Sequence, residues 1–207
     1  MTDSARLLDA WRDTLPGAEA LGADLLRRWS EPWRHYHDLE HLDEVLAALG
    51  ELAGHAAPAT VRLAAWFHDA IYDPGVDDNE ERSAELAAET LPPAGLTADV
   101  VSEVVRLVRL TATHDPAADD ADGMLLCDAD LAILGSTTRR YKRYVAAVRA
   151  EYAHVPDAAF RAARDRILQG FVDRSRIYHT DAARDRWESA ARRNLTAELA
   201  GDADRPR

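Results

Sequence analysis

Histidine and aspartate side chains that could bind a metal ion occur in three separate stretches of the chain. The stretches read RHYHDLEH over residues 34–41, WFHDAIYD over 66–73 and LLCDADLAILG over 125–135. Imidazole nitrogens combined with carboxylate oxygens suit a catalytic divalent cation that keeps open coordination positions. With a single cysteine, Cys127, the chain cannot form a CxxC metal site or an internal disulfide. The candidate donors are His37, His41, His68, Asp69, Asp128 and Asp130.

Two of these stretches hold pairs between which the sequence does not choose. His37 and His41 lie four residues apart, so they share a face of any helix that includes both. Val45 follows His41 at helical spacing, which predicts that His41 points inward, where a histidine is often only hydrogen-bonded. Asp128 and Asp130 diverge around a helix, and at least one of them should point into the core.

His68 and Asp69 are adjacent in a segment with apolar residues on both sides. A buried charge needs a partner or a metal, so the adjacency favours metal binding. The alternative is a salt-bridged pair at a helix C-terminus before Pro74. His114 ends a further apolar helix and, taken alone, is better explained as a cap of that helix's C-terminus than as a ligand.

Helices must position these side chains, because apolar residues recur at spacings of three and four throughout and no stretch alternates convincingly with period two. Thr137 and Thr180 are predicted to lie at or beside helix N-caps. The sequence therefore predicts an all-α, single-domain helical bundle of irregular topology over 1–207. Its parts are N-terminal helices (1–30), a metal-site core (34–135), C-terminal helices (137–199) and a tail (201–207). The predicted helices span 4–15, 18–29, 38–53, 58–72, 79–91, 97–113, 123–135, 137–153, 157–173 and 182–199.

The 207 residues carry 37 Asp and Glu against 25 Lys and Arg, a formal net charge of -12. So acidic a chain argues against general nucleic-acid binding and against anionic membrane surfaces. No apolar run approaches a membrane span and no signal peptide is evident at the start, so we expect a cytoplasmic protein. Residues 69–81 and 115–130 contain six acids each and no Lys or Arg, whereas the chain beyond Thr137 is basic. This distribution predicts an acidic entrance to the metal pocket that attracts cations. The basic residues that offset this charge are expected from the C-terminal helices.

The order His, His-Asp, Asp on successive helices resembles the HD superfamily of metal-dependent phosphohydrolases. The blocks RHYHDLEH, WFHDAIYD, NEERSA and DADLAILG resemble a bacterial subgroup described as predicted HD phosphohydrolases. The resemblance runs from about Arg34 to Leu195 and implies an HD-type helical domain. It is specific for the family and uninformative about the substrate.

The resemblance implies that His41, His68, Asp69 and Asp130 are the metal ligands. In addition, His37, His114 and Asp128 would belong to a second shell or to a second metal. Many relatives have a basic residue after the last aspartate, whereas this chain has Leu131, so a phosphate contact used by those relatives is missing or supplied elsewhere. We expect a divalent ion, and the sequence does not choose among Mn, Mg, Co, Ni, Zn and Fe.

The expected reaction is attack of metal-activated water on phosphorus in a small phosphorylated substrate, with a nucleotide as the first candidate. Asp73 and Glu80 are candidates for the general acid or base because they lie close in sequence to His68 and Asp69. The candidate phosphate contacts are Arg34, Lys142 and Arg164.

Three other readings remain open at this stage. One is a non-catalytic module that binds metal or nucleotide. Another is a di-iron oxygenase, which normally takes more histidines between Asp69 and Asp130 than the one present, His114. The last treats the polar residues as part of the core of a scaffolding bundle. A homo-oligomer is compatible with the sequence.

Overall fold

The computed structural model describes residues 4–53 and 57–201 of the chain. The regular secondary structure in these ranges is helical throughout, which confirms the predicted all-α class. The chain folds into two compact units, Met1–Asp130 and Leu131–Arg207. None of the helices within the described ranges is both long and apolar enough to cross a membrane. Apart from Gly201, the predicted tail lies outside those ranges.

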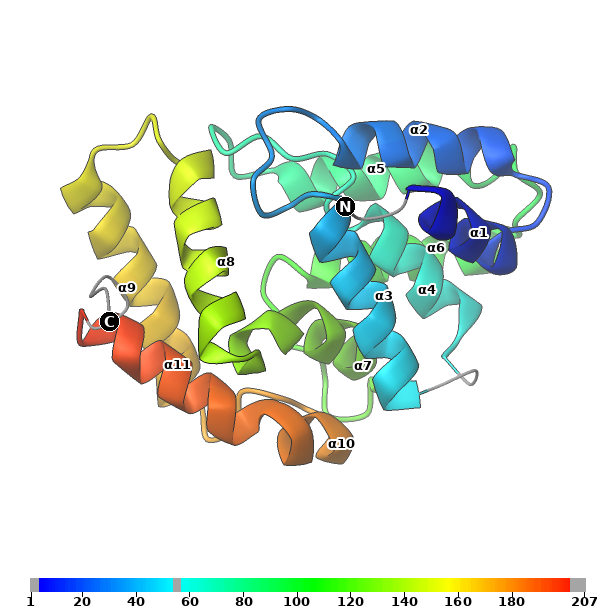
Figure 1. Ribbon diagram of the computed structural model, residues 1–207. Coiled ribbons are helices and arrows are strands. Elements are labelled where there is room, and N and C mark those ends of the chain that lie inside the picture. The colour runs from blue at the N-terminus through cyan, green and yellow to red at the C-terminus, as the bar shows by residue number, and fades with distance from the viewer. Residues whose placement is uncertain (1–3, 54–56, 202–207) are drawn as a thin grey trace. The chain divides into compact units, whose positions relative to one another are not determined.

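The first unit is built around α3, α4 and α7, which contact one another (Figure 1). α6 packs against α4, α5 and α7, and Trp29, Trp66 and Phe67 are fully buried. α1 approaches α2 closely because Gly22 leaves room for the Trp11 ring, which any side chain at that position would strike. The helices are α1 (Ser4–Thr14), α2 (Glu19–Trp29), α3 (Leu39–Ala53), α4 (Ala59–Phe67), α5 (Asn79–Thr90), α6 (Ala98–Leu110) and α7 (Ala121–Asp130).

α4 ends at Phe67, although the apolar spacing predicts a helix that continues to residue 72. Beyond it the chain tightens into a turn in which the Ala70 N–H donates to the Phe67 carbonyl at 3.0 Å. The carbonyls of Asp69 and Ala70 accept hydrogen bonds from the Arg34 guanidinium at 2.7 and 3.1 Å. A side chain from outside the helix thus satisfies acceptors that a continuing helix would have used.

Two other predicted helices also end early, and both ends carry candidate site residues. α6 ends at Leu110 instead of residue 113, and a turn then leads to His114. The helix predicted over 123–135 divides at Asp130, where α7 gives way to a tighter 3₁₀ helix, η2 (Leu131–Gly135). The chain therefore departs from regular α-helix at three points that carry His68, His114 and Asp130.

In the second unit, α11 packs against η2 and α9, and α8 also contacts η2. The Asn194 amide donates to the carbonyls of Leu134 and Ser136, both at 2.9 Å, and so ties α11 to the end of η2. Thr137 and Thr180 each accept a backbone N–H at a helix start, which confirms both predicted caps. Besides η2, the elements are α8 (Thr138–Glu151), α9 (Asp157–Asp173), α10 (Asp181–Ala183), a π-helical turn η3 (Arg184–Glu188) and α11 (Ser189–Leu199).

Candidate metal centre

Three side chains from different helices converge in the first unit. His41 lies near the start of α3, His68 follows the last residue of α4, and Asp130 ends α7. His41 Nε2 lies 3.2 Å from His68 Nε2 and 3.1 Å from Asp130 Oδ1. His68 Nε2 lies 3.4 Å from the same carboxylate oxygen. These three side chains form a group that could hold a metal ion.

The Asp69 carboxylate lies beside the same nitrogens. Its Oδ2 is 3.2 Å from His68 Nε2 and 3.7 Å from His41 Nε2. Ligand atoms that each bind one divalent cation at about 2.0–2.2 Å lie roughly 3–3.5 Å apart around it. The spacing and the mixed nitrogen and oxygen chemistry therefore fit a divalent ion. His41, His68, Asp69 and Asp130 are called the His/Asp cluster below.

The sequence did not choose between His37 and His41, or between Asp128 and Asp130. The group that could hold a metal ion contains His41 and Asp130. Asp128, two residues earlier on α7, is fully buried but is not part of the group. His37 precedes α3, and its ring stacks on Tyr72 with centroids 4.0 Å apart. His37 therefore lies beside the cluster, at 5.8 Å between its ring centroid and that of His41.

Backbone contacts set the proton position on His68. Its Nδ1 lies 2.9 Å from the Ala65 carbonyl oxygen, which can only accept, so Nδ1 carries the hydrogen. In the neutral ring, Nε2 is then the lone-pair nitrogen that faces the cluster. Burial lowers the pKa of His68, but the carboxylates of Asp69 and Asp130 outweigh burial and hold that pKa well above its usual value. A bound cation would compete with this proton, so metal binding should release it.

The two carboxylates of the cluster are strongly acidic. Burial raises the pKa of Asp69, but the imidazoles of His68 and His37 outweigh it and leave that pKa well below its usual value. The pKa of Asp130 is likewise lowered against burial, through His68 and through hydrogen bonds from His114 and His41. Both groups are thus held as anions, the form that a metal ligand requires.

Arg34, a predicted phosphate contact, binds backbone carbonyls in the structure. Its side chain is fully buried, and its guanidinium donates to the carbonyls of His37 (2.9 Å), Asp69 and Ala70. The Arg34 Nε donates to Glu31 at 3.1 Å. The guanidinium therefore joins the segment before α3, which carries His37, to the turn after α4, which carries Asp69.

Glu80 and Asp73 occupy different environments. Burial raises the pKa of Glu80, and the negative charge of Asp69 adds to this effect, so Glu80 lies within electrostatic reach of the cluster. Asp73 is exposed, and its Oδ1 accepts the backbone N–H of Gly75 at 2.8 Å in a local turn. Of the two predicted acid–base candidates, Glu80 is thus the one coupled to the cluster.

The structure also explains the polar residues Asn79 and Ser83 of the NEERSA block, to which sequence reasoning assigned no individual role. The Asn79 side chain accepts from the Asp73 N–H and donates to the Asp73 carbonyl, both at 2.9 Å. Ser83 does the same for Ile71, at 3.0 and 3.2 Å. The block therefore fixes the segment that follows His68 and Asp69. The spacing of two polar residues four apart at a helix start was the signal available for this role.

Aromatic rings surround the histidines of the cluster, and sequence reasoning did not assign them a place there. Tyr36 lies 4.6 Å from His41 and Trp29 lies 5.4 Å from His68, between ring centroids. Such rings exclude water and strengthen electrostatic interactions within the cluster. Tyr36 lies inside the RHYHDLEH block, whereas nothing in the spacing of Trp29 pointed to the site.

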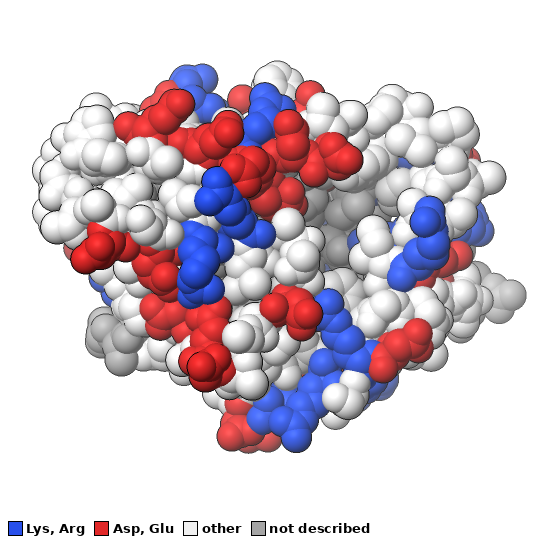
Figure 2. Space-filling view, turned by 180° about the vertical axis from the view of Figure 1, so that it is seen from behind, with Lys and Arg blue, Asp and Glu red and all other residues white. Residues whose placement is uncertain are grey.

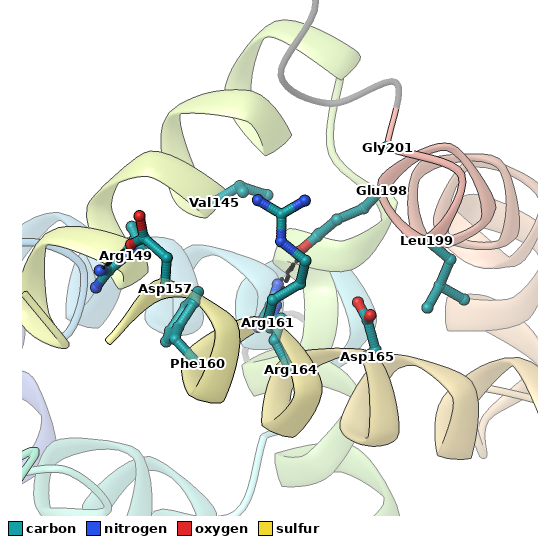
Figure 3. Close-up of a pocket in the computed structure, with 10 residues that line it drawn as sticks. All are labelled: Val145, Arg149, Asp157, Phe160, Arg161, Arg164, Asp165, Glu198, Leu199 and Gly201. Atoms are coloured by element: carbon teal, nitrogen blue, oxygen red, sulfur yellow. Dashed lines mark hydrogen bonds and ion pairs between the residues drawn. The ribbon is translucent and has the colours of Figure 1, made fainter. Parts of the chain in front are cut away.

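The remaining predicted phosphate contacts belong to the second unit. Arg164 lines a pocket with residues of α8, α9 and α11 (Figure 3), where its Nε donates to Glu198 at 2.9 Å and its guanidinium to the Tyr144 hydroxyl at 2.8 Å. Lys142 lies on α8 and is half-buried. The guanidinium of Arg164 thus takes part in a hydrogen-bond network with Glu198 and Tyr144.

Acidic side chains gather in groups on the face shown in Figure 2, with Lys and Arg side chains between them. Of the acids in residues 69–81, Asp73, Asp77 and Asp78 are exposed, whereas Asp69 is buried. The acidic excess of that segment therefore divides between the surface and the His/Asp cluster.

No protein-family model, curated protein or solved structure matches the chain. The geometry of the cluster is therefore the evidence on which a function can be argued.

Proposed function

We propose that the chain is a divalent-metal-dependent phosphohydrolase of the HD type, acting in the cytoplasm on a small phosphorylated molecule, with nucleotides as the first class to test. The observation that carries the proposal is the convergence of His41, His68, Asp69 and Asp130, whose facing atoms lie 3.1–3.7 Å apart. Two imidazoles and two carboxylates are the donor set of a hydrolytic metal site.

The four side chains of the cluster would hold the ion. A divalent ion in such a site lowers the pKa of a water molecule and polarises a phosphoryl oxygen. Burial raises the pKa of Glu80, the direction that suits a group that gives a proton to the leaving oxygen. Arg34 donates to the backbone carbonyls of His37, before α3, and of Asp69, after α4. It therefore contributes by positioning the segments next to the ligands.

The test is phosphate release by protein stripped with a chelator and reloaded with Mn, Mg, Co or Ni. The panel covers nucleotides, sugar phosphates and phosphodiesters. We expect turnover of at least one class with metal, and loss of both metal and turnover in His68→Ala. Glu80→Gln should lower kcat by about 100-fold at unchanged metal content, because general acid catalysis contributes about that much or more.

The matched control is Glu81→Gln, a neighbouring acid that pairs with Arg109 at the surface, and it should retain turnover. If the protein binds metal but hydrolyses none of the panel under any loading, the hydrolase proposal is wrong. A non-catalytic metal-binding module would then be the better description.

A further inference from the structure

His114 has a backbone conformation that its side-chain type does not favour. Its φ is +49°, and among the described residues it alone combines a positive φ with a side chain larger than that of glycine. The His114 N–H donates to the Leu110 carbonyl at 3.0 Å, directly after α6. This is the left-handed helix-ending position, where glycine is usual and asparagine is the common alternative.

The imidazole of His114 reaches the end of another helix, α7. Its Nε2 lies 2.7 Å from Asp130 Oδ2. An ionised carboxylate only accepts hydrogen bonds, so Nε2 must carry the hydrogen and donate it. A nitrogen that carries a hydrogen has no lone pair for a metal, which sets His114 apart from the histidines of the cluster.

This bond assigns different partners to the two oxygens of Asp130. Oδ2 accepts from His114, while Oδ1 faces His41 at 3.1 Å and His68 at 3.4 Å. The carboxylate is thereby turned with one oxygen toward the cluster. Asp130 is also where α7 passes into η2, so the regular helix does not continue beyond it to hold this orientation.

We propose that His114 is a positioning residue of the metal site, which orients Asp130 so that one carboxylate oxygen is presented to the ion. The proposal rests on the metal binding in the proposed function and deepens it. It implies one metal ion per chain, with His114 outside its coordination sphere. A residue other than glycine that keeps a positive φ, as His114 does, is expected where its side chain has a functional role.

Three variants separate the side chain from the backbone. His114→Gly removes the donor but suits the positive φ, so loss of function in it cannot come from added strain. His114→Gln carries the same backbone penalty as histidine but places an amide N–H at about the reach of Nε2. Ala112→Gly adds the same flexibility to the same turn at an exposed residue, and serves as the matched control.

The readout is binding of Co²⁺ to chelator-treated protein by calorimetry, together with the visible absorption spectrum of the bound ion. We expect His114→Gly to weaken binding by about 10- to 100-fold, as for other residues that orient a ligand. His114→Gln should recover most of that loss, and Ala112→Gly should bind as the wild type does. The melting temperature of each metal-free variant shows that it is folded.

Equal affinity in His114→Gly and the wild type would overturn the positioning role. Binding of two ions by the wild type, one of which is lost in His114→Gly, would overturn it in favour of direct ligation. Failure of the wild type to bind any divalent ion would overturn the metal site itself, and that failure is visible before any variant is compared. Weaker binding in His114→Gly with recovery in His114→Gln would support the proposal even if no substrate were found.

Discussion

Each unit of the protein holds a buried group of charged side chains, and the two groups are built differently. In the second unit, Glu198 accepts from Arg164 at 2.9 and 3.3 Å and from the Tyr141 hydroxyl at 2.6 Å. Arg164 also donates to Tyr144 (Figure 3 shows Arg164 and Glu198 in the pocket). Positive charge meets negative charge and donors meet acceptors, so this network is complete as it stands.

The His/Asp cluster of the first unit lacks that balance. Its facing atoms are imidazole nitrogens and carboxylate oxygens, and the hydrogen on His68 Nδ1 is directed away to a backbone carbonyl. Without the proton that the raised pKa of His68 holds, the atoms at its centre would be rich in lone pairs, and a cation could take the place of that proton. Buried charge alone therefore does not mark a metal site. A metal site is marked by facing side chains that offer more acceptor atoms than donor hydrogens.

The largest expected effect concerns metal affinity and separates the two groups. Asp130→Asn removes the charge of a ligand without changing its size, so Co²⁺ affinity should fall more than the about 10- to 100-fold typical of an orienting residue. Glu198→Gln should leave the affinity unchanged. Calorimetry and the metal-induced rise in melting temperature measure both. If Glu198→Gln weakened metal binding as much as Asp130→Asn, the distinction between the two groups would fail.

The next effect concerns stability and belongs to the second unit. Glu198→Ala leaves the buried Arg164 guanidinium without its counter-charge and should lower the free energy of unfolding by about 3 kcal/mol, measured by urea denaturation. Replacing Arg164 by Leu in the same chain should restore much of this loss. Asp157→Ala, which breaks the exposed pair with Arg149, is the control and should change little. No recovery in the double variant would mean that Glu198 has a role beyond neutralising Arg164.

The sequence predicted the helices and the three stretches of the cluster, because both depend on local spacing. It did not predict where the helices stop, since α4 ends where Arg34, distant in sequence, takes up the carbonyls of Asp69 and Ala70. The hydrogen-bond partners of Arg34 and Arg164 escaped sequence reasoning for the same reason, because they lie 34–36 residues away along the chain. For His114 the sequence favoured a helix cap, and the backbone does end α6 while the side chain serves Asp130.

The smallest expected effect is a difference in pH dependence between the two groups, measured on metal-free protein. The folded pKa of His68 is raised above its unfolded value of about 6.5, so its contribution to stability is complete below that pH and is lost as pH rises through the folded pKa. The folded pKa values of Asp69 and Asp130 are lowered, so their contribution is present above about pH 4 and is lost as pH falls.

The first unit should therefore be most stable between about pH 4 and 6.5 in the presence of a chelator, and should lose stability as pH rises above that range. Burial raises the pKa of Tyr141, so this hydroxyl of the second unit should stay protonated over this range. Hydrogen exchange followed by mass spectrometry measures the local stability of α3, α4 and α7 separately from that of α8 and α11. Saturating Co²⁺ should abolish or reverse the loss in the first unit, because an ion favours the neutral imidazole that higher pH supplies. Equal pH dependence in both units, with and without metal, would show that the His/Asp cluster is a structural network like the other.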